Sequence, residues 1–299
     1  MVLEVKNLTK KFNESTAVND FNFNINTGKM LGFLGGNGAG KTTTFRMILG
    51  LTEPTKGEIY YNNKKLDKTV YNDIGYLPEE RGLHPKRKVK EEIKFLAKLK
   101  GMSNKNIDYA LSYWFERLNI SQYRHKKIET LSKGNQQKIQ FLASIIHKPH
   151  LLILDEPFSG LDPVNVENLK NIVKELNEQG TTIIFSSHRM DHVEELCDEI
   201  CLINKGTLLL NDSIKNIKKK AAHKKVLIES NENLNFLLDI DGVLDLETNK
   251  KNKIFSVTNN YVANIIFKNI SKLDSIKKFE ILEPSLNDIF IEKVGGSFE

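Results

Sequence analysis

A glycine-rich loop carries the strongest chemical signal in the sequence. Residues 35–42 read GGNGAGKT and fit the pattern G-x-x-x-x-G-K-[ST], between a short apolar run and a segment of helical spacing. Glycines let backbone N–H groups surround phosphate oxygens, the lysine reaches the β- and γ-phosphates, and the threonine hydroxyl serves Mg²⁺. A glycine-rich turn that happens to end in Lys-Thr is the alternative. We predict a nucleotide-phosphate site made of Gly35, Gly36, Asn37, Gly38, Ala39, Gly40, Lys41, Thr42 and Thr43.

Two adjacent carboxylates, Asp155 and Glu156, end the apolar run that begins at Leu151. Ligands of open α/β sheets collect at the C-terminal ends of the parallel strands. We therefore predict that Asp155 holds Mg²⁺ through its water shell and that Glu156 orients and polarises the water that attacks the γ-phosphate. A pair of acids that only caps the strand is the alternative.

Three further segments are less specific when each is taken alone. LSKGNQQK at 131–138 places a serine and a glycine at a helix start, which an ordinary N-cap also explains. His188 follows the apolar run IIFSS, where a histidine with a structural hydrogen bond is the more frequent case. SGLDP at 159–163 can be a simple turn. Their place beside the phosphate loop and the carboxylates is what raises their interest.

The elements that must position these residues follow from the hydrophobic pattern. Alternating apolar and polar residues predict antiparallel strands at 2–8, 17–25 and 57–63. Continuous apolar runs predict buried parallel strands at 30–35, 151–156 and 181–188, joined by crossover helices such as 166–180. A run of helical periodicity over about 89–147, with Trp114 expected in its core, indicates a helical insertion in this α/β unit.

The composition shifts after Asn211. SIKNIKKKAAHKK at 213–225 is basic and poor in apolar residues, so we expect a linker there. Strand and helix patterns then alternate as β-α-β-β-α-β over 226–299, with a last helix from Ser285. The sequence therefore predicts an α/β unit at 1–212 and a small α+β domain of split βαβ type after the linker.

Composition excludes several classes of protein. Of the 299 residues, 39% are hydrophobic and 27% are charged, so overall disorder is excluded. No stretch reaches the length of apolar residues that spans a bilayer, and the N-terminus does not read as a secretion signal, so we expect a cytosolic protein. The net charge of +6 is too small to name a partner. His188, His192, Cys197 and Cys201 allow a metal site, although small buried cysteines are the commoner case.

These elements, in this order, resemble the ATP-binding subunit of an ABC transporter over about residues 1–211. The phosphate loop, helical insertion, signature sequence, Walker B strand with its glutamate, D-loop and switch histidine all occur in sequence. Three segments resemble more narrowly the ATPase subunits of bacterial sodium-extruding exporters of the Nat type. They are YLPEERGLHPKRKV at 76–89, LSKGNQQKIQF at 131–141 and EPSLNDIFIEKVG at 283–295. The resemblance implies a P-loop NTPase cassette with a mixed sheet and an inserted helical subdomain.

The resemblance also implies roles for single residues. Two chains would pair head to tail on ATP and Mg²⁺, as a homodimer or as a heterodimer with another ABC ATPase. His188 would contact the γ-phosphate, Asp162 would cross the interface, and Phe12 would stack on the adenine with Val18 nearby. Glu79 stands where the family has a glutamine that binds Mg²⁺, so it adds a negative charge beside the phosphates. The signature residues that would close on the partner's ATP are Ser132, Lys133, Gly134 and Asn135.

The leading hypothesis from the sequence is an ATPase subunit at the cytoplasmic face of the membrane that drives a separate integral membrane permease. Export of sodium, a drug or a peptide fits it, and nucleic acid is not an expected partner. The docking surface for the permease would be the helical insertion with the loop 79–89. The rival hypothesis is a soluble ABC ATPase that acts on ribosomes or nucleic acid. The single cassette and the lack of sustained heptads in the sequence argue against the rival.

Overall fold

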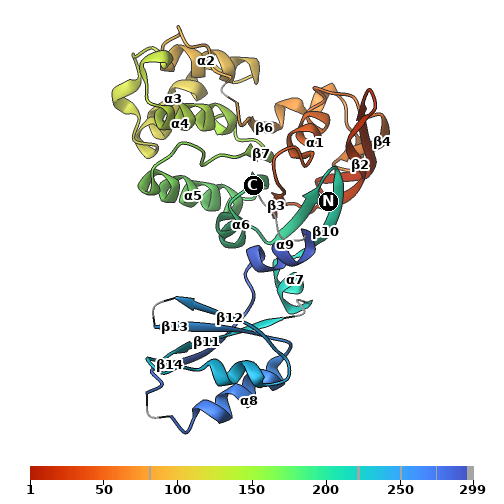
Figure 1. Ribbon diagram of the computed structural model, residues 1–299. Coiled ribbons are helices and arrows are strands. Elements are labelled where there is room, and N and C mark those ends of the chain that lie inside the picture. The colour runs from red at the N-terminus through yellow and green to blue at the C-terminus, as the bar shows by residue number, and fades with distance from the viewer. Residues whose placement is uncertain (81, 221–222, 250, 274, 295–299) are drawn as a thin grey trace. The chain divides into compact units, whose positions relative to one another are not determined.

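The computed structural model describes residues 1–80, 82–220, 223–249, 251–273 and 275–294. Residue 81 of the expected docking loop and residues 295–299 of the expected C-terminal domain therefore lie outside the described residues. The chain divides into two compact units, Met1–Ser213 and Ile214–Glu299 (Figure 1).

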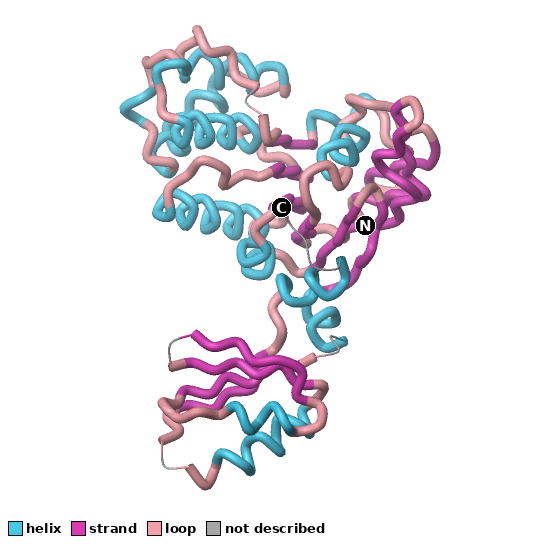
Figure 2. The backbone as a smooth tube through the Cα atoms, viewed as in Figure 1, coloured by secondary structure: helices cyan, strands magenta, loops and turns pink. Residues whose placement is uncertain are grey.

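The first unit is built on a ten-stranded mixed sheet (Figure 2). Its order is β5-β4-β1-β2-β10-β9-β3-β8-β7-β6. Strands β3, β6, β7 and β8 pair in parallel, as do β3 and β9, whereas β1 pairs antiparallel with β2 and β4. The bounds are β1 Leu3–Phe12, β2 Ser15–Ile25, β3 Met30–Leu34, β4 Lys56–Tyr61, β5 Lys64–Lys65, β6 Ile74–Leu77, β7 Leu151–Asp155, β8 Thr182–Ser187, β9 Glu199–Asn204 and β10 Thr207–Ser213.

The continuous apolar runs form the centre of this sheet. All residues of β3, β7 and β8 are buried, because helices cover both faces of a parallel sheet. Phe33 packs against Phe23 and Phe45 with ring centroids 5.0 and 5.3 Å apart. The sequence analysis did not predict β6, β9 or β10. β6 is only four residues long and contains a glycine, and the pattern of β10 is broken by a register shift against β9.

Three helices follow the central parallel strands of the sheet. They are α1 Lys41–Ile48 after β3, α5 Pro163–Glu178 after β7 and α6 Met190–Leu196 after β8, and a 3₁₀ turn, η1 Lys68–Asn72, precedes β6. α5 begins at Asp162, whose side chain accepts the N–H of Asn165, and it is followed by Gly180 in the left-handed conformation. In the described part of the chain, no helix has both the length and the apolar character that a bilayer span requires.

The helical insertion consists of α2 Val89–Leu99, α3 Asn104–Arg117 and α4 Lys133–Ile145, with the 3₁₀ turns η2 Ser121–Tyr123 and η3 Ile128–Thr130 (Figure 1). Trp114 does not lie in the core of the insertion, as the sequence analysis expected. The buried stripe of α3 is formed by Ile107, Leu111 and Phe115, and Trp114 lies beside this stripe, partly exposed.

The second unit has an antiparallel four-stranded sheet in the order β12-β13-β11-β14. β13 lies between β11 and β12, which is the arrangement that defines a split βαβ fold. The helix expected near residue 235 is a 3₁₀ turn, and α8 packs on the sheet through Val262, Ala263 and Ile266. The elements are α7 Ile214–Lys220, β11 Lys224–Glu229, η4 Asn235–Asp239, β12 Val243–Asn249, β13 Asn252–Val257, α8 Asn260–Ile270, β14 Lys278–Leu282 and α9 Leu286–Val294.

The basic segment 213–225 is not the plain linker that its composition suggested. Residues 214–220 form α7, and β11 already begins at Lys224. Ile217 is buried to 5% exposure, so one apolar side chain per turn is enough to anchor a short helix whose other residues are mostly lysines. The segment was not predicted as a helix because its composition is rich in lysine and only one of its side chains, Ile217, is buried.

Candidate functional site

The phosphate loop connects β3 to α1 and shapes a cavity of about 180 Å³. Lys41 is buried, and its Nζ donates hydrogen bonds to the carbonyl oxygens of Gly35 at 2.7 Å and Gly36 at 3.2 Å. Gly40 has φ +107°, and a Cβ there would lie 2.5 Å from the carbonyl oxygen of Ala17. Only glycine can therefore open α1 at this point. The cavity is lined by Ala17, Glu79, Glu156, His188 and residues 36–43.

Asp155 lies under this cavity at the end of β7 and is fully buried. Its Oδ2 accepts a hydrogen bond from the Thr42 hydroxyl at 2.9 Å, and its Oδ1 accepts one from the Ser186 hydroxyl. The two bonds fix the carboxylate and the Thr42 hydroxyl relative to each other. Ser186 was not predicted from the sequence, because its contact depends on the register between β7 and β8, in which Asp155 is opposite Ser186.

Glu156 and His188 form a pair at the mouth of the cavity. Glu156 Oε2 lies 3.0 Å from His188 Nδ1, and the His188 ring is 65% exposed. Burial raises the pKa of Glu156 above its ordinary value, although His188 and Lys41 oppose this shift. Glu156 also has φ +49°, a left-handed conformation that is unfavourable for glutamate and that is concentrated at functional sites. A buried carboxylate with a raised pKa beside a phosphate loop can accept a proton from water.

The loop that carries Glu79 is held by α4. Gln140 Nε2 donates to the carbonyl oxygens of Pro78 at 3.0 Å and Glu80 at 2.9 Å, so the residues on both sides of Glu79 are tied to the helix. Gln137 Nε2 donates to the carbonyl oxygen of Pro157, just after Glu156. Neither glutamine has a role predicted from the sequence, although both fall within the segment 131–141, which carries the family resemblance. One helix therefore positions both the Glu79 loop and the end of β7.

The two residues expected at the adenine have different surroundings. Phe12 is 51% exposed and is not among the residues that line the cavity, and Lys10 Nζ lies 5.1 Å from the centroid of its ring. Val18 is fully buried in the core and does not line the cavity. Because successive residues of a strand face opposite sides, Ala17 lines the cavity in its place.

A second cavity, of about 500 Å³, gathers the signature residues and Asp162. Ser132 caps α4 and Asp162 caps α5, so two helix N-termini meet the same space. Hydrogen bonds from Asn165 lower the pKa of Asp162, and burial lowers the pKa of Lys138 on the cavity wall. Its residues are distinct from those of the phosphate-loop cavity, and they include Ser132, Lys133, Gly134, Asn135, Lys138 and Asp162.

The residues considered for a metal site are dispersed. His188 faces Glu156, whereas the His192 ring packs edge-on against Phe158 with centroids 5.0 Å apart. Cys197 and Cys201 are buried, and burial raises the pKa of both thiols. The two cysteines therefore act as small apolar side chains.

Comparison with known proteins decides the family. The family described as ABC transporter matches residues 18–159, and the family described as ATP-binding protein DrrA1-3-like, C-terminal domain, matches residues 213–294. The ABC transporter ATP-binding protein YhaQ of Bacillus subtilis (strain 168) is 48% identical over 298 residues, which cover 100% of this chain and 100% of that protein. The chain belongs to the ABC transporter ATP-binding proteins.

Two further likenesses bear on this ABC ATPase. The bacitracin transport ATP-binding protein BcrA of Enterococcus faecalis is 36% identical over 224 residues, 73% of this chain and 71% of that protein. A solved dimeric structure of the ATP-binding cassette MJ0796, in a post-hydrolysis state bound to ADP and phosphate, has a TM-score of 0.66 and 25% identity. It covers 71% of this chain and 98% of its own. The ABC ATPase binds ATP and hydrolyses it to ADP and phosphate.

Proposed function

We propose that this ABC ATPase powers a separate membrane-spanning permease that exports peptides or drugs. The name of BcrA refers to bacitracin transport, and this favours export of a drug or peptide over export of sodium, which the narrower Nat-type resemblance suggested. In this proposal the ATPase lies at the cytoplasmic face of the membrane and the permease supplies the transport path. The Glu156–His188 pair at the mouth of the phosphate-loop cavity carries the ATPase part of the proposal, and the similarity to BcrA carries the export part.

We further propose that the working ATPase site is shared between two chains. Ser132 and Asp162 lie at their own cavity and not at the phosphate loop of the same chain. A head-to-tail pair of chains, either identical or not, would bring the signature cavity of one against the ATP held by Lys41 of the other. Two helix N-termini and Lys133 would then face the γ-phosphate, which is where positive potential stabilises charge.

Within one chain, we assign distinct roles to the residues around the ATP phosphates. Lys41 exchanges its carbonyl partners in the loop for phosphate oxygens, and Glu156 accepts a proton from the attacking water. His188 keeps the Glu156 carboxylate oriented and adds a donor near the γ-phosphate. Phe12 stacks on the adenine, and Asp162 reaches the partner chain.

The residues around Thr42 fit a magnesium ion. Thr42 and Asp155 share a hydrogen bond of 2.9 Å between oxygens, and Glu79 lines the same cavity, so hard oxygen donors converge there. Bound Mg²⁺ would supply charge neutralisation at the phosphates. The carboxylate of Glu79, in the place of an amide, makes the donor set more negative and should favour metal binding over release.

We place the permease contact beside the Glu79 loop. A cavity of about 280 Å³ is lined by Leu83 and Pro85 from this loop and by Ile128, Gln136 and Gln140 from the helical insertion. Because Gln140 also holds both neighbours of Glu79, a partner seated here would act directly on the metal-site loop. Leu83→Asp should reduce transport more than basal hydrolysis, and equal loss of both would count against docking at this cavity.

The proposed function is tested by capture of partners. Tagged Glu156→Gln protein, incubated with ATP and Mg²⁺, is purified from soluble and detergent-solubilised membrane fractions, and co-purifying proteins are identified. Recovery of a multi-span membrane protein only with ATP supports the transporter. Recovery of ribosomes or nucleic acid alone would overturn it in favour of a soluble ABC ATPase.

A further inference from the structure

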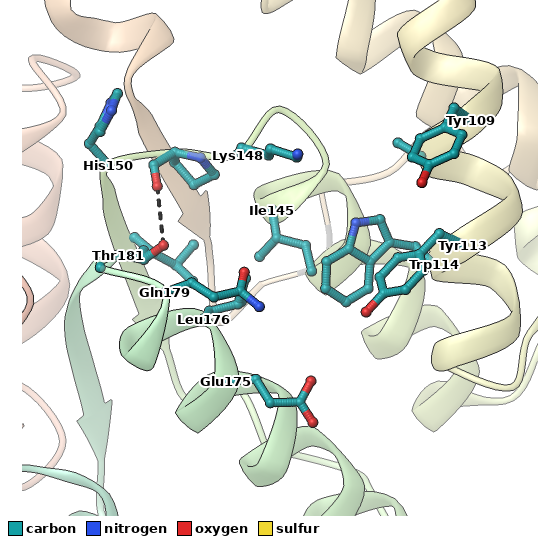
Figure 3. Close-up of a pocket in the computed structure, with 14 residues that line it drawn as sticks. Tyr109, Tyr113, Trp114, Ile145, Lys148, His150, Glu175, Leu176, Gln179 and Thr181 are labelled. Carbon is teal, nitrogen blue, oxygen red and sulfur yellow. Dashed lines mark hydrogen bonds between the residues drawn. The ribbon is translucent and has the colours of Figure 1, made fainter.

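A cavity of about 430 Å³ lies at the boundary between the helical insertion and the sheet of the first unit (Figure 3). Trp114 and two tyrosines of α3 form one wall, and Leu176 and Gln179 at the end of α5 form the opposite wall. None of its residues belongs to the phosphate-loop or signature cavity. Its volume falls in the range of about 300–1,000 Å³ that is typical of small-molecule sites.

The wall formed by α3 is aromatic and unusually exposed. Tyr109 and Tyr113 lie one helical turn apart in α3, and their side chains are 80% and 52% exposed, respectively. The rings of Tyr113 and Trp114 meet edge to face with centroids 5.0 Å apart. Ile145 and Leu176 face them across the cavity (Figure 3). Planar rings gain contact area and favourable edge-to-face geometry in such a slot.

One charge of the cavity is uncompensated. Among the described residues, the Lys148 ammonium group has no ion-pair or hydrogen-bond partner, and the side chain extends over the cavity (Figure 3). Glu175 also lines the cavity, but it is paired with Arg117, which donates to its carboxylate. Among the described residues, Lys148 is therefore the one unpaired ionic group that the cavity presents beside its apolar aromatic wall.

We propose that this cavity is a binding site for a planar aromatic anion. The rings of the ligand lie between Trp114 and Leu176, and its anionic group meets Lys148. This assignment rests on the cavity itself and holds whatever the transported substrate is.

The position of the cavity connects it to the ATPase site. α4 runs from the signature residue Ser132 to Ile145 at the cavity, and α5 runs from Asp162 to Glu175. β7 likewise begins beside the cavity and ends at Asp155. A ligand that fills the space between α3 and α5 restrains the helical insertion against the sheet, so it should change the rate of hydrolysis. This second step rests on the proposed function.

The binding step is tested with 8-anilinonaphthalene-1-sulfonate, an aromatic anion, and with N-phenyl-1-naphthylamine, which has the same ring system without the charge. Trp114 is the single tryptophan of the chain, so energy transfer from tryptophan to the probe reports binding near it. Lys148 has φ +56°, and asparagine tolerates this conformation, so Lys148→Asn removes the charge without added backbone strain. Lys205→Asn is the matched control, because Lys205 also has positive φ and lies in a distant turn.

We expect Lys148→Asn to weaken the anionic probe about threefold to fivefold and to leave the neutral probe within about twofold, since the ion pair that is lost involves an exposed lysine. Lys205→Asn should bind both probes as the parent does. Equal binding of the anionic probe by parent and Lys148→Asn, or complete displacement of that probe by ATP and Mg²⁺, would overturn the site.

The second step is measured as ATP hydrolysis at saturating anionic probe. A change of at least about twofold in the parent that is lost in Lys148→Asn supports the coupling. An unchanged rate, with binding proven, refutes the coupling. Absence of hydrolysis in the parent, with probe binding intact, would refute the proposed function and leave the cavity assignment standing.

Discussion

The phosphate-loop cavity and the signature cavity, which we propose to be two halves of one site, are built in opposite ways. At the phosphate loop Lys41, Asp155 and Glu156 are buried, and Lys41 is already bonded to loop carbonyls and Thr42 to Asp155. At the signature cavity Ser132 and Asp162 are exposed, and each bonds only to its own helix start. The side chains of the first half are already held in place for chemistry, whereas the second half has two helix N-termini that can bind the phosphate of an ATP held, as we propose, by another chain.

This difference has an electrostatic reason. A buried lysine is costly unless its charge is compensated, and Lys41 obtains compensation from two carbonyl oxygens of its own loop. Helix N-termini carry only partial charge and tolerate solvent, so Ser132 and Asp162 need no internal partner beyond the cap. In the shared site that we propose, catalysis depends mainly on the buried Lys41 and Glu156 of one chain, and the ATP-dependent contact depends on exposed groups of the other.

The largest effect is expected at the buried half. Glu156→Gln should lower kcat for ATP by about 10²–10⁴-fold, because the general base is lost while the shape of the site is kept. Because burial raises the pKa of Glu156, the ionised carboxylate opposes folding at neutral pH, and the Tm of the variant should be equal or higher. Turnover and Tm are measured on the same preparation, and unchanged turnover would refute the assignment of the base.

The pH dependence gives the next largest effect. With a raised pKa, Glu156 becomes protonated at a pH above its ordinary value of 4.5, and a protonated carboxyl cannot accept a proton from water. The hydrolysis rate should therefore fall about tenfold per pH unit below this raised pKa and level off above it. A pH profile of kcat checks this, and Glu156→Gln should lack that acid limb. An acid limb that persists in the variant would assign the titration to another group.

At the exposed half, two substitutions of Ser132 separate capping from catalysis. Ser132→Ala removes the cap of α4 and should cost about 1 kcal/mol of stability and about tenfold in hydrolysis. Ser132→Asp keeps the cap but places a negative charge against the γ-phosphate, so stability should hold while hydrolysis falls further. Chemical unfolding and steady-state hydrolysis are compared. If hydrolysis falls only in the variant that loses stability, Ser132 has a structural role as a helix cap and no role at the γ-phosphate.

The smallest effect is expected where α4 joins the two halves. Gln140→Ala frees the backbone on both sides of Glu79 and should cost about 1–2 kcal/mol, with a several-fold rise in the KM for Mg²⁺. Gln136→Ala is the control. Gln136 lies on the same helix and also donates to two backbone carbonyls, but these belong to Ile128 and Leu131 and not to the Glu79 loop. The same change in both variants would show that Gln140 does not position the metal-site loop in particular.

The same contrast explains what the sequence could predict. The phosphate loop, Asp155 and Glu156 were predicted because each motif is continuous and follows a buried apolar run. Ser186 and Gln140 were missed because their contacts depend on the register between strands and on the packing of α4, which a linear pattern does not contain.

Two expectations were overturned for local reasons. Trp114 falls just outside the buried stripe of α3, where a shift of one position along the helix moves a side chain to the cavity wall. Residues 214–220 form the helix α7, although most of them are lysines, because Ile217 is buried and anchors the helix.

Mixing two inactive variants tests the shared site most directly. Lys41→Ala disables the phosphate loop, and Ser132→Arg blocks the signature cavity. A mixed dimer of the two still contains one intact composite site, so an equal mixture should recover about a quarter of the parent hydrolysis rate, since half of the dimers are mixed and each has one site of two. Each variant alone should be inactive. No recovery on mixing, or full activity of Ser132→Arg alone, would contradict a site built from two chains.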